Sequence, residues 1–419
     1  MRYKIRLGVV LTSLAFVHGG YPLAAEVPAG TVISKANLDS LKNETFEGKP
    51  IGSMIPEKME MQIRDYGMTI DLRSSEPIGL DPRMIEATKK YSGEVKYDPA
   101  TNEVTGYKAG VPFPDANPDD PNYAEKLVWN FYYASPVGQV MDFRRWTYLL
   151  VDQDKGVERR QHWYFLRYFM KNRLTGENVP VDGDGTEFSR TLLFAIYPQD
   201  IRGLGTFTIR YDSPQVEDSW VYIKSARRTR RLPGGAWMDP IGGTDQLNDD
   251  LEIWNARPSW YRGFKYLGKR WVLAVTHGRV AWDESKKGTP EEYPAIDTQN
   301  PPHWNPKDGY EPREVHVIET IPPEEHPYSR KIIYMDTETL RIYYGEAYDR
   351  KGDFWKWLQF NARPIKGEDG TMTIATTQGH TIDFKRRHAT IFLSHPSWKT
   401  NTPIKASDVT LGKLEAAGQ

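Results

Sequence analysis

The residues best suited to chemistry are the carboxylates between positions 239 and 252. The acidic residues and the tryptophans that flank them are Asp239, Asp245, Asp249, Asp250 and Glu252, with Trp237, Trp254 and Trp260. Paired carboxylates among tryptophans are typical of a glycosidase cleft. The same residues also fit a capped loop before a short helix, with Thr244 or Asp245 as the cap. A periplasmic hydrolase acting through the loop 239–252 is therefore one alternative.

A basic stretch directly precedes this acidic loop. It contains Lys224, Arg227, Arg228, Arg230 and Arg231. Such a stretch can bind nucleic acid, but a dedicated nucleic-acid binder usually carries a basic surplus, and this chain has a formal net charge of -1. We therefore predict no nucleic-acid partner. Ion pairs between the basic stretch and the acidic loop would explain both runs without a ligand. The same five basic residues are also candidates for a partner-docking surface.

Other catalytic patterns are missing from the sequence. The chain has no cysteine, which excludes thiolate chemistry and zinc–thiolate sites. Eight of its nine histidines follow residue 25, and none is paired with another at metal-ligand spacing. We find no G-x-S-x-G, H-E-x-x-H or phosphate-loop motif. The sequence therefore predicts no catalytic residue, no metal site and no cofactor.

The N-terminus has the pattern of an export signal. Arg2, Lys4 and Arg6 precede an apolar run from Leu7 to Val17, and small residues follow at Ala24 and Ala25. The run is short for a membrane anchor, so we predict a cleavable signal peptide at 1–25 and a periplasmic protein.

Three amphipathic helices are predicted in the first third of the chain. One begins at Pro56 and ends at Gly67, and a second begins at Pro82 with Asp81 as its cap. A third begins near Pro121, with apolar residues at helical spacing, and must end before Pro136.

Short strands separated by tight turns follow from about residue 140. Aromatic content is high, with 13 Trp, 24 Tyr and 15 Phe, and Gly and Pro mark many turns. This pattern predicts a mainly β (α+β) chain in which a large curved antiparallel sheet is covered by the N-terminal helices. We divide the mature chain into an N-terminal helical and extended segment at 26–95, a sheet domain at 96–399 and a tail at 400–419.

Several of these stretches resemble one known family. They are YKAGVPFP (107–114), KLVWN (126–130), FAIYPQDIRGLGTFTIRYDSP with SWVYIKSARRTRRLP, GGTDQLNDDLEIW, and IIYMDTETLRIYYGEAYDRKGDFWK (332–356). In this order they resemble the exported domain-of-unknown-function family 1329, which is described as similar to outer-membrane lipoprotein-sorting proteins. The resemblance covers residues ~100 to ~395, so it implies most about the strand-rich part of the chain.

The resemblance implies a fold similar to the lipoprotein carriers LolA and LolB, which is an open half-barrel under helices with an apolar cavity. It also implies a partner, because members are often encoded near transporters of the resistance-nodulation-division type. A lipid or other hydrophobic cargo would then need no catalytic residue, because burying an acyl chain gains ~0.8 kcal/mol per methylene. The candidate cavity lining alternates along three strands and consists of Phe194, Ile196, Phe207, Ile209, Trp220 and Tyr222.

These observations favour a non-catalytic periplasmic carrier that makes at most peripheral contact with a membrane. An outer-membrane β protein is the remaining alternative, since aromatic alternating strands suit one. Charged residues on both faces of the strands and the polar C-terminus KLEAAGQ speak against it.

Overall fold

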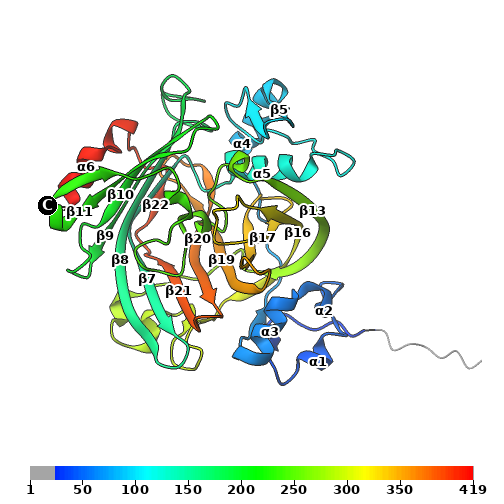
Figure 1. Ribbon diagram of the computed structural model, residues 1–419. Helices are drawn as coiled ribbons and strands as arrows, with labels where there is room; N and C mark the ends of the chain where they lie inside the picture. Colours follow the sequence, from blue (N-terminus) through cyan, green and yellow to red (C-terminus); the bar gives the residue numbers. More distant parts are fainter. Residues whose placement is uncertain (1–23, 419) are drawn as a thin grey trace, which may run out of the picture.

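A computed structural model describes residues 24–418. The predicted signal peptide therefore lies almost entirely outside the described residues. The described chain is mainly β, and its long strands form one curved sheet (Figure 1). The fold class predicted from the sequence is confirmed.

Sixteen strands among the described residues form this sheet. Their order is β1-β4-β16-β17-β18-β19-β20-β21-β7-β8-β9-β10-β11-β12, while β13 pairs with β16 and β22 with β7. All pairings are antiparallel except that of β16 with β4. The bounds are β1 Val32–Ile33, β4 Ile70–Leu72, β7 Val140–Asp152, β8 Gly156–Phe169, β9 Glu187–Tyr197, β10 Gly205–Tyr211, β11 Asp218–Ile223, β12 Arg228–Arg231, β13 Gly263–Ala274, β16 Gly309–Ile321, β17 Arg330–Asp336, β18 Ile342–Tyr348, β19 Phe354–Lys366, β20 Met372–Asp383, β21 His388–Ser394 and β22 Lys399–Thr400.

The sheet is open. Its order ends at β12 on one side and at β1 and β13 on the other, and within residues 24–418 these ends are not paired. Three two-stranded ribbons lie outside it: β2 (Thr45–Phe46) with β3 (Lys49–Pro50), β5 (Lys96–Asp98) with β6 (Glu103–Thr105), and β14 (Ile296–Asp297) with β15 (Asn305–Pro306). Every residue of β18 is buried, so this central strand is covered on both faces. Strands covered on both faces read as continuous apolar runs.

The helices are α1 Leu38–Leu41, α2 Ile51–Met54, α3 Glu57–Tyr66, α4 Pro82–Tyr91, α5 Tyr123–Ala134 and α6 Leu411–Gly418. The first two predicted helices are confirmed as α3 and α4. Gly67 ends α3 in the left-handed conformation (φ 66°), and the Asp81 side chain accepts a hydrogen bond from the N–H of Arg83 at the start of α4. The third, α5, begins at Tyr123, two residues after Pro121.

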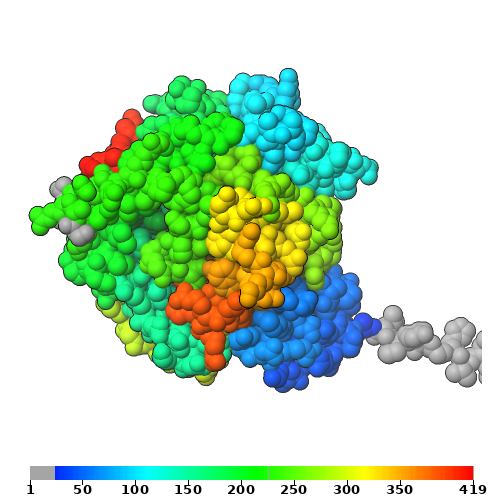
Figure 2. Space-filling model, in the orientation of Figure 1, coloured from blue at the N-terminus to red at the C-terminus, as the bar shows by residue number. Residues whose placement is uncertain are grey.

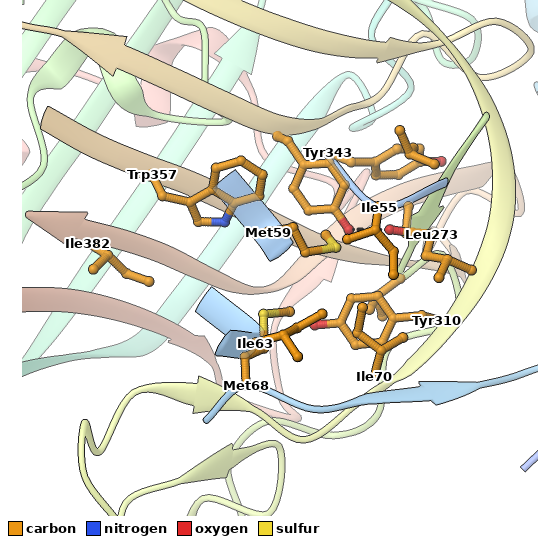
Figure 3. Close-up of a cluster of buried hydrophobic side chains, with 14 of the residues drawn as sticks. Ile55, Met59, Ile63, Met68, Ile70, Leu273, Tyr310, Tyr343, Trp357 and Ile382 are labelled. Atoms are coloured by element: carbon orange, nitrogen blue, oxygen red, sulfur yellow. Dashed lines mark hydrogen bonds between the residues drawn. The ribbon is translucent and has the colours of Figure 1, made fainter. Parts of the chain in front are cut away.

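The N-terminal segment packs against one face of the sheet. Met59 and Ile63 of α3 lie in a buried cluster with Tyr343 and Trp357 of the sheet (Figure 3). At the surface this segment, blue in Figure 2, lies against the orange strands, where Tyr66 contacts Phe384 edge-on. The helical cover predicted for this segment is therefore present.

The predicted segment boundaries do not coincide with breaks in the sheet. From the N-terminal segment, β1 and β4 join the main sheet, where Asp71 pairs with Gly309. At the other boundary, β22 spans residues 399 and 400, and the predicted tail continues into α6. Leu414 of α6 is fully buried against β9–β11, so this tail is a packed part of the fold.

Candidate functional site

The inside of the curved sheet is occupied by the chain itself. Residues 236–261, which we call the interior segment, pack against both halves of the sheet. Trp254 and Tyr261 lie in a buried cluster with residues of β16–β19, such as Leu358. Ile241 lies in a second cluster with residues of β7–β9, such as Trp163. The interior segment therefore fills the concave side, where the half-barrel prediction expects a cargo cavity.

Buried ion pairs hold the middle of the interior segment. Asp249 and Asp250 follow each other in a short 3-10 helix, and both are fully buried. The Nζ of Lys331, on β17, lies 3.1 Å from Asp249 Oδ2 and 2.8 Å from Asp250 Oδ1. Tyr261 and Tyr328 donate their hydroxyls to the same two carboxylates, at 2.6 and 2.7 Å. The buried ammonium group of Lys331 thus bridges the two carboxylates.

The protonation state of this cluster follows from its contacts. Burial opposes ionisation of Asp249, but Lys331, His326 and Tyr261 outweigh it and lower the pKa of Asp249 to about 2. Asp249 is thus a permanently ionised structural group at neutral pH. A glycosidase general acid needs a raised pKa instead.

The carboxylates on either side of this cluster, Asp245 and Glu252, have their own partners. Asp245 accepts hydrogen bonds from Thr390 at 2.8 Å and Arg386 at 3.0 Å, and its Oδ2 lies 2.5 Å from His388 Nδ1. Burial works against ionisation of Asp245, yet the bond to His388 gives it a net lowered pKa. On the other side of the cluster, Glu252 pairs with Arg341 of the sheet.

The predicted pairing of the acidic loop with the basic stretch is therefore wrong. The carboxylates pair with Lys331, Arg341, Arg386 and His388, which come from distant strands and turns. The reason is that the loop turns inward, while β12 lies at the outer edge of the sheet. Of the two caps proposed for the short helix, neither is used, since Leu247 stands at that position.

A small apolar pocket remains between the interior segment and the sheet. Its wall consists of Met141, Phe143, Trp146, Phe165, Arg167, Gln246, Leu251, Glu252, Phe360 and Phe392. Its cavity volume is about 30 Å³, which is room for about two water molecules. The concave side is thus nearly filled in this conformation.

A second, polar pocket adjoins the apolar one and shares Phe165, Arg167 and Leu251 with it. Its other walls carry hydroxyl and amide groups from β9, β10 and the interior segment, among them Thr191, Thr208 and Asn255. Its cavity volume is about 40 Å³.

The predicted lining residues lie on the opposite face of the sheet. Phe207 and Tyr222 are buried, with Phe194, Ile209 and Trp220 half-buried beside them, in a cluster with Leu414 and other C-terminal residues. Ile196 is also half-buried and lies on β9, the strand of Phe194. The concave face instead carries the alternate residues, such as Leu193 and Thr206. Cargo lining by these six residues stays a prediction, and α6 and the chain before it cover five of them.

The basic stretch lies at the outer edge of the sheet. The side chains of Lys224, Arg227, Arg228 and Arg230 are exposed, and within residues 24–418 none of them lies within ion-pair distance of a carboxylate. Arg231 pairs with Asp218 of the adjacent strand β11. We call the run Lys224–Arg231 the basic edge.

The concave residues were missed because nothing in the sequence singles them out. Met141, Phe143 and Phe165 read as ordinary strand residues, and Arg167, between Leu166 and Tyr168, reads as a solvent-facing charge. The one usable signal is that Arg167 sits in an otherwise aromatic strand, HWYFLRYF.

Within the described part of the chain, no group of three or more potential ligands is arranged to hold a metal ion. Residues 24–418 also contain no helix with the length and apolar character needed to cross a membrane.

The fold and its concave side define a class of protein. In this class an open antiparallel sheet curves around one segment of its own chain, and an apolar pocket lies between the sheet and that segment. The model of the family described as "Protein of unknown function (DUF1329)" matches residues 32–410. The chain belongs to this family, as the resemblance indicated.

Known proteins resemble the chain at modest identity. An uncharacterised protein of Pseudomonas aeruginosa is 23% identical over 354 residues, which cover 81% of this chain and 70% of that protein. Among solved structures, a putative outer membrane lipoprotein-sorting protein domain of Vibrio parahaemolyticus is 16% identical, covering 67% of this chain and 93% of that one, with a TM-score of 0.44. A DUF1329 family protein of Desulfovibrio piger is also 16% identical, covering 66% and 92%, with a TM-score of 0.42.

Proposed function

We propose that this protein is a non-catalytic carrier that binds a lipid or another hydrophobic molecule on the concave side of its sheet. The observation that carries the proposal is the apolar pocket between the sheet and the interior segment. Seven of its ten wall residues are apolar, and five of these are aromatic: Phe143, Trp146, Phe165, Phe360 and Phe392. Apolar pockets with a few polar groups are typical ligand sites.

The pocket must widen to admit a cargo, because its present volume suffices for about two water molecules. We propose that the wall formed by residues 251–253 of the interior segment moves to admit it. Glu252 (φ 54°) and Ile253 (φ 70°) are consecutive non-glycine residues in the left-handed region. This conformation is costly, above all for a β-branched residue. A shift of residues 251–253 would relieve this strain and open the pocket.

The energetics favour such a carrier over an enzyme. Each methylene buried contributes ~0.8 kcal/mol, so a long acyl chain offsets the loss of the contacts that close the pocket. Asp249 and Asp250, the carboxylates most central to the hydrolase alternative, are already committed to Lys331. We propose that the carrier acts in the periplasm, in line with the predicted signal peptide, and uses no cofactor.

The size of the side chain at position 251 tests the proposal. Leu251 lies in the wall of both pockets. We expect Leu251→Trp to fill the apolar pocket and weaken binding of N-phenyl-1-naphthylamine, a neutral fluorescent dye, by at least about tenfold. Leu251→Ala should keep or strengthen binding. Fluorescence titration of the purified protein measures both affinities.

Val216→Trp is the matched control, because Val216 is 37% exposed and lies in neither pocket. Thermal unfolding of each variant shows that the fold is kept. Unchanged dye affinity in Leu251→Trp, or no dye uptake by any form, would exclude the concave pocket as the cargo site.

We also propose that the carrier exchanges its cargo at an anionic membrane surface through the basic edge. Four unpaired cations support this, each worth about 1 kcal/mol near an anionic bilayer. Tyr197, which is 50% exposed, is the last residue of β9, and in the turn after it the carbonyl of Gln199 accepts a hydrogen bond from Lys224 at 2.8 Å. A transporter of the resistance-nodulation-division type, which the family resemblance suggests, would receive or supply the cargo there.

A further inference from the structure

Arg167 is a cation without a counter-ion in the concave face. It lies on β8, and Phe165 and Leu251 join it in the wall between the two pockets. Its Nε–H donates to the hydroxyl of Thr191 at 3.1 Å, and no carboxylate of residues 24–418 lies within ion-pair distance of it. Its guanidinium carbon lies 5.2 Å from the ring centre of Phe165.

The nearby carboxylates are already committed to other cations. Glu217 accepts from Arg210 at 2.6 and 2.9 Å, and Glu252 pairs with Arg341. Both pairs are neutral as units, so Arg167 remains as one uncompensated positive charge. Burial, with a smaller contribution from Arg210, lowers the pKa of Arg167 to about 10. The guanidinium is therefore still charged at neutral pH, although its surroundings disfavour the charge.

Arg167 is half-buried, and a charge withdrawn from solvent is costly unless something pairs with it. A hydrocarbon cargo would not compensate Arg167, and an arginine is the side chain best suited to a planar or branched anion. The position of Arg167 fixes where the anion would lie. On one side is the apolar pocket, and on the other are the hydroxyl groups of Thr191, Thr206 and Thr208.

We infer that the concave site binds a single-chain amphiphile with an anionic head, a carboxylate or a phosphate, which pairs with Arg167 while the chain enters the apolar pocket. This inference rests on the proposed carrier function and names its ligand class. The hydroxyl-lined pocket accommodates the remaining oxygen atoms of the head. Arg167 thus sets both the orientation and the charge of the cargo.

The test compares charged and uncharged ligands of the same chain length. We use cis-parinarate, a fluorescent long-chain fatty acid, its methyl ester, and N-phenyl-1-naphthylamine. Wild-type protein should bind the acid ~10- to 100-fold more tightly than the ester. In Arg167→Gln this preference should disappear while the affinity for the neutral dye is kept, and Arg167→Lys should restore part of it.

Arg159→Gln is the matched control, since Arg159 lies on the same strand, is 39% exposed at its side chain and pairs with Asp200. It should bind all three ligands as the wild type does. Displacement of parinarate by dodecyl phosphate, compared with dodecanol, shows whether a phosphate head is also accepted.

The outcomes separate this inference from the carrier proposal. Equal binding of acid and ester by the wild type, which needs no variant, overturns the role of Arg167 and leaves the carrier function in place. Unchanged acid preference in Arg167→Gln also overturns it. If neither the dye nor the acid binds, the carrier function fails and this inference fails with it.

Discussion

At the scale of single residues, His388 and Asp245 form the contact most sensitive to pH. They are 143 positions apart in the chain and meet where the interior segment contacts β21, with Arg386 and Glu158 also facing the histidine. The hydrogen bond to Asp245 raises the pKa of His388 above its ordinary 6.5, although burial opposes this. Asp245 itself has a lowered pKa and stays ionised.

The sign of the pH effect follows from the raised pKa. The stabilising contribution of His388 is complete below pH 6.5 and is lost as the pH rises through the folded-state value. We therefore expect His388→Gln to cost about 2 kcal/mol in unfolding free energy near pH ~6 and clearly less near pH ~9. Urea unfolding of both proteins at the two pH values measures this.

His316→Gln provides a control, because the pH dependence of its stability effect should have the opposite sign. Burial lowers the pKa of His316 to about 4, so this residue favours the folded state most when neutral. The difference between wild type and His316→Gln should therefore shrink below pH ~6.5. A pH-independent cost for His388→Gln would show that its bond to Asp245 is not charge-assisted.

At the scale of elements, the C-terminal helix α6 belongs to the predicted tail and covers one face of strands β9–β11. The side chain of Leu414 is 0% exposed to solvent and packs in the cluster with Phe207 and Tyr222. We expect Leu414→Ala to lower the free energy of unfolding by about 3 kcal/mol, the usual cost of a cavity at a buried leucine. Chemical denaturation checks this value.

Lys413→Ala is the comparison for that experiment, because Lys413 is exposed on the same helix. It should change the unfolding free energy by less than about 0.5 kcal/mol. Equal effects of the two substitutions would mean that α6 is not docked on the sheet in solution.

Elements also show what the sequence could predict. The predicted helix ends lie within about two residues of the observed ones, because Pro56, Gly67 and Asp81 determine these ends locally. The alternation in β9–β11 correctly placed Phe194, Phe207 and their neighbours on one face, but both faces of this sheet are covered. Alternation tells which residues share a face, and it does not tell which face meets the concave side.

The partners of the candidate site were out of reach for a different reason. Lys331 is 82 positions from Asp249, and Arg386 is 141 positions from Asp245. Such pairings depend on the order of the strands in the sheet. The nearest basic residues in the sequence, those of the basic edge, proved to be the wrong partners.

At the scale of the whole molecule, charge is distributed unevenly. The chain is nearly neutral overall, yet the basic edge collects unpaired cations beside α6, at the left of Figure 1. We expect the protein to sediment with vesicles of phosphatidylglycerol and phosphatidylethanolamine at ~50 mM salt and to detach at ~500 mM. The double variant Arg227→Glu/Arg228→Glu should bind at least about tenfold more weakly.

The control reverses two neighbouring charges elsewhere. Lys89 and Lys90 are exposed on α4, at the other side of the molecule (Figure 1), and neither lies within ion-pair distance of a carboxylate of residues 24–418. Lys89→Glu/Lys90→Glu should sediment like the wild type. Equal loss in both variants would indicate a general charge effect, and binding that requires a transporter in the vesicles would indicate a protein partner.

The pairing of β4 with β16 has a consequence for the order in which the molecule can form. The N–H of Glu76, just after β4, bonds to the carboxylate of Glu311, which follows 235 positions later. The strand β4 is therefore synthesised long before its partner strand β16 exists. Contacts of such long range slow folding, and until then the apolar face of α3 has nothing to cover it. We therefore expect the apolar residues of α3, such as Met59 and Ile63, to stay exposed during synthesis until the sheet has formed.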